Sequence, residues 1–339
     1  MAEENSINAL PVVCAAILTA AALYFGSAIF APVAVSLFVI AILWPLQKSL
    51  ESRIPRLLTL AATVVIIGTL ASMIAWGIGM VGRWLMANIG RFYVLYGMTT
   101  EWLEGHGILL AGPLSERFNV LSLVRMFQEV AVRINGLVGF SLMVLIFTML
   151  GLLEVGDFRQ KLQALRNGAV AERMLAATAS ISGKFRKYLL VRTLASILTG
   201  LVVWGFTFAL DIELAAAWGV IAFALNYIPV IGPLIATVLP TLFTAAQFES
   251  WQMALLVFLG LNVIQFVIGS YLEPRFSGSA LAISPFVVVL AVFFWSFLWG
   301  IPGAFIGVPV TIAMLAACDA NPASRWIATL LSGPSRDKT

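Results

Sequence analysis

LNYIPVIGPLIATVLP, residues 225–240, is the stretch on which the fold of this chain depends. It contains Pro229, Pro233 and Pro240, with Gly232 between the first two, and it has no charged residue. Proline removes a backbone N–H group and breaks or kinks a helix. The flanks are nevertheless apolar, so the break falls inside a hydrophobic region, and unpaired backbone groups are most costly at membrane depth.

The composition of the whole chain indicates a membrane protein. Hydrophobic residues make up 61% of its 339 residues and charged residues 11%, against roughly 45–50% and about 25% in soluble domains. Several segments exceed the ~18 apolar residues of a membrane-spanning helix. We therefore predict an all-α polytopic membrane protein with about eight hydrophobic segments, including re-entrant hairpins broken by Gly and Pro, together with amphipathic extramembrane helices.

Apolar and charged segments alternate along the chain and divide it into six parts. They are three transmembrane helices in 1–82, an amphipathic extramembrane arm in 83–133, a fourth transmembrane helix in 134–153, a basic cytoplasmic segment in 154–188, a transport core with two broken hairpins in 189–318, and a cytoplasmic tail in 319–339. The second helix is expected to stop at Pro45. The Lys and Arg residues of the loops favour cytoplasmic locations for both termini, and the net charge of +4 is not taken as a sign of nucleic-acid binding.

Two apolar blocks have lengths that suit hairpins of half-spans. Residues 214–247 are too long for one span of about 20 residues and rather short for two, so a turn at 228–233 is expected. The block 283–318 has a second expected turn, formed by Gly300, Pro302, Gly303, Gly307 and Pro309. Paired hairpins of this kind point to the substrate site of a transporter. The alternative is that the prolines only shape helix packing.

Polar side chains beside these breaks are the candidates for contact with a small polar solute. The predicted substrate-binding set is Asn226, Pro229, Gly232, Pro233, Thr237, Thr241, Asn262 and Gln265. Asn262 and Gln265 are three residues apart and share a helical face. Hydrogen bonding between helices is the alternative role for this pair.

Glu273 and Arg275 are the candidates for ion coupling. Glu273 follows a long apolar run, and a carboxylate within the membrane is costly when charged, which suits a proton or cation site. The alternative is an interfacial ion pair between Glu273 and Arg275. The single histidine, His106, and two cysteines give no basis for a metal cluster. We expect no cofactor, and the absence of a catalytic constellation argues against an enzyme.

Three late motifs resemble those of the autoinducer-2 exporter (AI-2E) family of transporters. They are LNYIPVIGP with its Asn-x-Ile-Pro-x-Ile-Gly-Pro turn at 226–233, a Pro-x-x-x-Gly segment leading to a second proline at 274–285, and a Gly-rich stretch ending in proline at 300–309. The layout of the amino-terminal half also matches the family, so the resemblance covers nearly the whole chain. Many members carry His where this chain has Ser284. If that His takes part in proton coupling in them, Ser284 cannot do so here.

The resemblance implies a multi-pass secondary transporter of the cell inner (plasma) membrane that assembles as a homo-oligomer. Members are similar to autoinducer-2 exporters, and some resemble sodium/proton antiporters. Three functions stay open: export of a small polar solute, sodium/proton exchange through Glu273, and a non-transporting membrane scaffold. The expected partners are the lipid bilayer, a small polar solute or monovalent cation, and further copies of the chain, but no nucleic acid. Broken hairpins argue against the scaffold, which has no need of helix ends at membrane depth.

Overall fold

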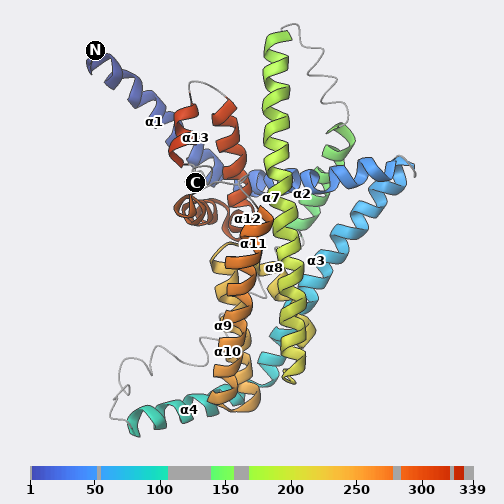
Figure 1. Cartoon of the computed structure of the whole chain (residues 1–339), viewed down its shortest axis with the longest axis vertical. Helices are drawn as coiled ribbons and strands as arrows, with labels where there is room; N and C mark the ends of the chain where they lie inside the picture. The colour runs from blue at the N-terminus through green and yellow to red at the C-terminus, as the bar shows by residue number, and fades with distance from the viewer. Residues whose placement is uncertain are drawn as a thin grey trace. The chain divides into compact units, whose positions relative to one another are not determined.

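Helices are the only regular secondary structure in the described part of the chain. The computed structural model describes residues 2–51, 55–105, 139–155, 168–277, 284–320 and 324–331. Within these ranges, 6 helices are long and apolar enough to cross a membrane, and three shorter apolar helices accompany them. Large apolar side chains such as Phe208 and Phe266 are 69% and 68% exposed, as expected of surfaces that face lipid. An all-α polytopic membrane protein is therefore confirmed (Figure 1).

The chain forms two compact units that alternate along the sequence. Unit 1 contains residues Met1–Thr63, Ser141–Leu189 and Ser279–Thr339, and unit 2 contains Val64–Phe140 and Leu190–Gly278. Helices α3 (Arg56–Ala87) and α7 (Gly168–Ala209) contribute residues to both.

Unit 1 contains the two amino-terminal helices and the last two helices. These are α1 (Ala2–Phe25), α2 (Ser27–Glu51), α12 (Pro285–Ala320) and α13 (Arg325–Leu331), together with most of the helix Gly139–Val155. The predicted stop at Pro45 is wrong, because α2 continues to Glu51. A single proline inside a membrane helix is tolerated where its surroundings pair the freed backbone group.

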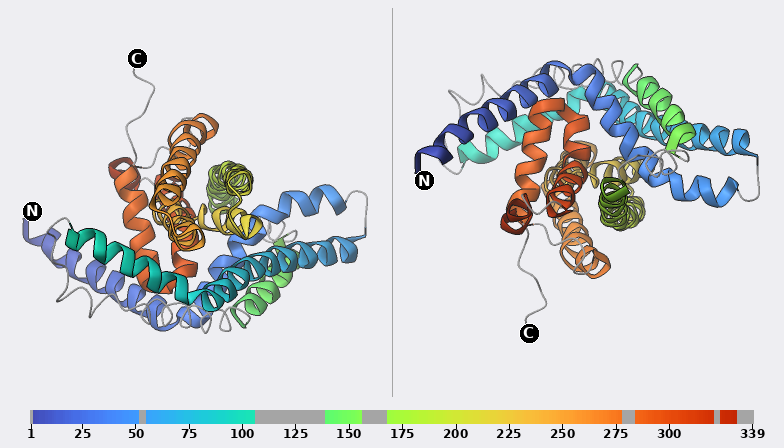
Figure 2. Two further views of the ribbon diagram at one scale, coloured as in Figure 1. Left: turned by 90° about the horizontal axis from the view of Figure 1, so that it is seen from below. Right: turned by 90° about the horizontal axis from the view of Figure 1, so that it is seen from above.

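Helix α12 is a hairpin rather than one straight helix (Figure 2). Gly300 has φ 64° and ψ −139°, a backbone conformation that side chains disfavour, and the chain reverses there. A Cβ atom at Gly303 would overlap the carbonyl oxygen of Trp295, so the two arms touch backbone to backbone. The indole of Trp295 donates to Thr311 Oγ1 across the two arms at 3.1 Å. The reversal falls where Gly and Pro predict the second turn.

Unit 2 is built around the other hairpin. Its further elements are α4 (Ile89–Gly105), α8 (Ala215–Leu225), α9 (Ile231–Phe248), α10 (Trp251–Phe266), the π-helix η1 (Val267–Leu272) and α11 (Glu273–Ser277). Helix α9 packs against both α8 and α10 (Figure 1). Trp218 and Phe243 lie at the centre of the core, with ring centroids 5.1 Å apart. Residues 106–133 of the predicted extramembrane arm, including His106, lie outside the described residues.

The turn between α8 and α9 satisfies its own backbone. Ile228 N–H donates to Leu225 O at 2.9 Å, and Gly232 N–H donates to Ile228 O at 3.0 Å. Val230 has a positive φ of 67°, which lets five residues reverse the chain. A Cβ atom at Gly232 would overlap the carbonyl oxygen of Leu225. Only glycine therefore permits α9 to begin this close to the end of α8.

A second polar contact closes the far end of this hairpin. The amide of Gln247 donates to Asp211 O and accepts from the backbone N–H of Glu213, both at 2.9 Å. The indole of Trp84 donates to the Glu213 carboxylate, and Arg91 donates to Gln247 O at 3.2 Å. These bonds link the end of α9 to the turn before α8 and to α3 and α4, so the hairpin is fixed at both ends.

We predict that Gly232→Ala and Gly303→Ala each destabilise the protein by about 3 kcal/mol or more, because each new methyl group meets backbone that cannot rotate away. Gly205→Ala on α7 is the matched control, since its Cβ would meet nothing within 4 Å and alanine is the better helix former. The measurement is the unfolding temperature of each purified variant in detergent. Equal behaviour of all three variants would contradict the close approach described here.

Candidate functional site

Helix α7 carries a charged and a hydroxyl side chain on a buried face of its apolar span, Phe185–Ala209. Arg192 is 6% exposed and Ser196 is 0% exposed. The two residues are four apart and so lie on one helical face, with Thr193 beside them. A charge within a membrane-spanning helix is costly and marks a functional position by default.

Arg192 forms an ion pair with Glu273, the carboxylate predicted from the sequence. Arg192 Nη1 lies 2.6 Å from Glu273 Oε1, and the two side chains are 7% and 23% exposed. The contact uses one nitrogen and one oxygen. The Nε–H group of Arg192 is buried and has no hydrogen-bond partner, which is unusual because buried donors are nearly always paired.

The alternative pairing of Glu273 with Arg275 is wrong. Arg275 donates instead to the phenol oxygen of Tyr271 at 2.6 Å, and its guanidinium carbon lies 4.1 Å from the centre of the Tyr271 ring. Residues two apart on a helix point in different directions, whereas residues four apart are neighbours. Helical geometry therefore places Arg275 beside Tyr271, and Glu273 pairs with Arg192.

The hairpin turn meets the same face of α7. Asn226 Nδ2 donates to Ser196 Oγ at 3.2 Å, and the phenol of Tyr227 donates to Thr193 Oγ1 at 2.9 Å. The positive charge of Arg192 also interacts electrostatically with the phenol group of Tyr227. We name this group the polar cluster; its members are Arg192, Thr193, Ser196, Asn226, Tyr227 and Glu273. It joins three elements of unit 2: α7, the turn after α8, and α11.

A π-helix directly precedes Glu273. Residues Val267–Leu272 form η1, which continues α10 with a wider turn. Short π-helical segments inside α-helices are rare and often occur at functional sites. A Cβ atom at Gly269, within η1, would meet nothing within 4 Å, so packing does not require glycine at this position. A π-turn contains more residues than an α-turn, so η1 rotates the residues that follow it about the helix axis. Glu273 follows η1 directly and contacts Arg192 on α7.

The other predicted binding residues have contacts of a more local kind. Thr241 donates to Thr237 O within α9, and Asn262 donates to Phe258 O within α10, at 2.8 and 2.7 Å. Thr237 is buried, and Gln265 Nε2 is buried without a partner. Neither member of the Asn262 and Gln265 pair donates to a second helix. A role for these residues in substrate binding stays a prediction.

The remaining predicted residues form the two turns. Pro229, Gly232 and Pro233 build the reversal between α8 and α9 in unit 2. The second set lies around the reversal of α12 in unit 1 and comprises Gly300, Pro302, Gly303, Gly307 and Pro309. Their structural role in the turns follows from the geometry above, and a role in transport stays a prediction.

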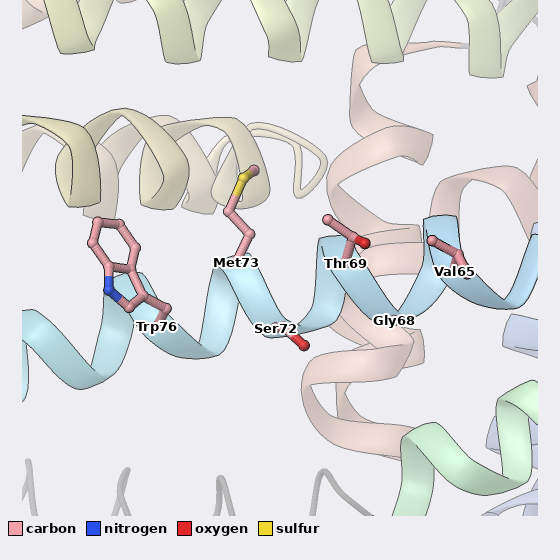
Figure 3. A pocket seen from close by; sticks show the side chains of 6 residues that line it. All are labelled: Val65, Gly68, Thr69, Ser72, Met73 and Trp76. Atoms are coloured by element: carbon pink, nitrogen blue, oxygen red, sulfur yellow. The ribbon is translucent and has the colours of Figure 1, made fainter.

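A shallow groove lies elsewhere in unit 2, along one face of α3. It is lined by Val65, Gly68, Thr69, Ser72, Met73 and Trp76 (Figure 3). All six residues belong to one helix and none is charged, so the groove offers a mostly apolar surface with two hydroxyl groups. It includes no residue of the polar cluster, and the predicted site does not coincide with it.

Four members of the polar cluster are absent from the set predicted from the sequence: Arg192, Thr193, Ser196 and Tyr227. One signal was available for Arg192, because it is the only charged residue between Leu189 and Leu210. A lone charge in an apolar span is rarely accidental. Ser and Thr in membrane helices usually bond their own backbone, as Thr199 and Thr207 do here, so the sequence did not single out Thr193 or Ser196.

Comparison with known proteins matches the chain to one family over most of its length. The model of the AI-2E family transporter matches residues 13–323. The chain belongs to the AI-2E transporter family. It is 30% identical over 319 residues to the AI-2 transport protein TqsA of Escherichia coli (strain K12), covering 92% of each chain. It is 25% identical over 342 residues to a putative transport protein of Haemophilus influenzae, covering 97% of this chain and 98% of the relative.

Membership of the AI-2E family and the apolar helices together give the general role of the chain. It is a multi-pass membrane protein with a role in transport. A putative transport protein of Borreliella burgdorferi is 36% identical over 191 residues, covering 55% of this chain and 52% of the relative. Family membership also speaks against an enzyme, in line with the expectation from the sequence.

We predict strong coupling between Arg192 and Glu273 in stability. Glu273→Gln leaves the charge of Arg192, which is 7% exposed, without its partner and should cost about 3–5 kcal/mol. Arg192→Met should cost less, because the carboxylate that it leaves behind is 23% exposed. The double variant removes both charges and should be more stable than Glu273→Gln alone. The measurement is a double-mutant cycle of unfolding free energies in detergent. Purely additive effects would show that the ion pair has no energetic role.

Proposed function

We propose that this protein is a secondary transporter that exports a small polar solute resembling autoinducer-2 across the inner membrane. The observation that carries the proposal is the polar cluster, in which a buried arginine, a carboxylate, an amide and hydroxyl groups meet beside a broken hairpin. Such turns provide helix ends and polar backbone at the depth where transporters bind substrates. The name of the similar TqsA protein, an AI-2 transport protein, supports this substrate class.

The chemistry of the cluster suits a solute rich in oxygen atoms. Arg192 supplies donors, Glu273 supplies acceptors, and the amide and hydroxyl groups supply both. The sequence contains no GxxxxGK[ST] nucleotide-binding loop, so we infer that an ion gradient or the solute's own gradient drives transport. We further infer that residues 189–318 act as the transport core, and that the chain works as a homo-oligomer with both termini in the cytoplasm.

Sodium/proton exchange is the second candidate function. The observation that favours it is the carboxylate of Glu273, which is held beside an arginine within apolar helices. A carboxylate in such a place can exchange a proton for a cation as its surroundings change. In this mechanism the carboxylate of Glu273 leaves Arg192, carries Na⁺ in one direction and returns carrying a proton in the other.

We predict that purified protein in lipid vesicles takes up labelled autoinducer-2. Asn226→Ala should lower the initial rate at least tenfold, because the side-chain amide beside the turn and its hydrogen bond to Ser196 are lost. Asn88→Ala is the matched control, since the Asn88 amide, in the turn between α3 and α4, donates to Trp84 O four residues earlier. The same vesicles carry an internal pH dye. Sodium-driven proton release that Glu273→Gln abolishes, without autoinducer-2 uptake, would replace export by sodium/proton exchange.

A further inference from the structure

The guanidinium group of Arg192 has one occupied edge and one edge without a hydrogen-bond partner, which we call the open edge. Glu273 contacts Nη1, the nitrogen on the side of the Cδ atom. The opposite edge is formed by Nε and Nη2, and Nε is buried without a hydrogen-bond partner. This Nε–Nη2 edge is the planar fork that binds a carboxylate through two parallel hydrogen bonds. An arginine held only by Nη1 is therefore ready for a second acceptor.

Two hydroxyl groups on the same turn of α7 add further donors to the polar cluster. Thr193 accepts from Tyr227, and Ser196 accepts from Asn226. Each hydroxyl group has one hydrogen and two lone pairs, so both keep a hydrogen that these contacts do not use. The available groups are thus mainly donors, and they suit acceptor oxygens on a ligand.

We propose that the open edge of Arg192 is a binding site for a small hydroxylated organic anion, with a carboxylate or a similar pair of oxygens on Nε and Nη2. The proposal rests on the proposed function and narrows its substrate class from polar solutes to oxygen-rich anions. Glu273 serves as a positioning residue that turns the guanidinium so that its fork faces away from the carboxylate. Glu273 also repels the bound anion, because both carry negative charge at close range.

The opposing effects of the two residues give the test. Glycerate is the probe, glycerol is the uncharged comparison, and affinity is measured by equilibrium dialysis with purified protein in detergent at fixed pH and salt. We expect glycerate to bind at least tenfold more tightly than glycerol. Arg192→Lys should weaken glycerate binding at least tenfold, because a lysine is a point charge without a fork. Glu273→Gln should strengthen it several-fold, because the repelling charge is gone.

The variants are chosen so that loss of folding does not imitate loss of binding. Arg192→Lys keeps a positive partner for Glu273, and the exposed Arg186 on the same helix provides the matched control Arg186→Lys. Size-exclusion profiles and unfolding temperatures check each protein. Glycerol binding as tight as that of glycerate would overturn the proposal, as would an unchanged affinity in Arg192→Lys.

Failure of this site and failure of the proposed function give different results. Vesicles that take up autoinducer-2, combined with protein that does not bind glycerate, would overturn the anion site and keep the transporter. Protein that binds glycerate through Arg192, combined with vesicles that do not take up autoinducer-2, would support the anion site and overturn the proposed substrate.

Discussion

The contact between Gly232 and the carbonyl group of Leu225 determines where the functional groups of unit 2 lie. Because no side chain separates the two, α9 begins directly beside the end of α8. The reversal then needs only five residues, and Asn226 and Tyr227 are its first two. A wider turn would move both side chains away from Ser196 and Thr193 on α7. The polar cluster thus depends on a steric condition that one glycine meets.

The same close approach of a glycine to a backbone carbonyl group occurs a second time in the chain. In unit 1, Gly303 approaches the carbonyl group of Trp295 as Gly232 approaches that of Leu225, and Gly300 provides the reversal with its positive φ. Each turn also contains proline, which cannot donate to the helix ladder and so adds no unpaired N–H group. Two hairpins with the same solution to backbone pairing explain why Gly and Pro occur together at both turns.

The features predictable from the sequence are those fixed by neighbouring residues. Apolar runs, Gly–Pro breaks and chain lengths are local, so the helical class and both reversals were predicted correctly. The partner of Glu273 is not local, because Arg192 lies 81 residues away in the sequence. Sequence proximity suggested Arg275, but Tyr271 occupies the correct helical position for Arg275. The π-helix η1 was also unpredictable, since nothing in VIGSYL distinguishes it from ordinary helix.

The ion pair is difficult to explain as a device for stability. Removing two charges from water costs several kcal/mol per ion, and apolar residues of similar size often serve stability as well or better. One contact of 2.6 Å offsets only part of that cost, and the buried Nε–H adds the penalty of an unpaired donor. A pair selected for stability alone would use both nitrogens of the fork. The fork of Arg192 instead has an Nε–H group without an acceptor, and the proposed role of Arg192 in ligand binding accounts for this arrangement.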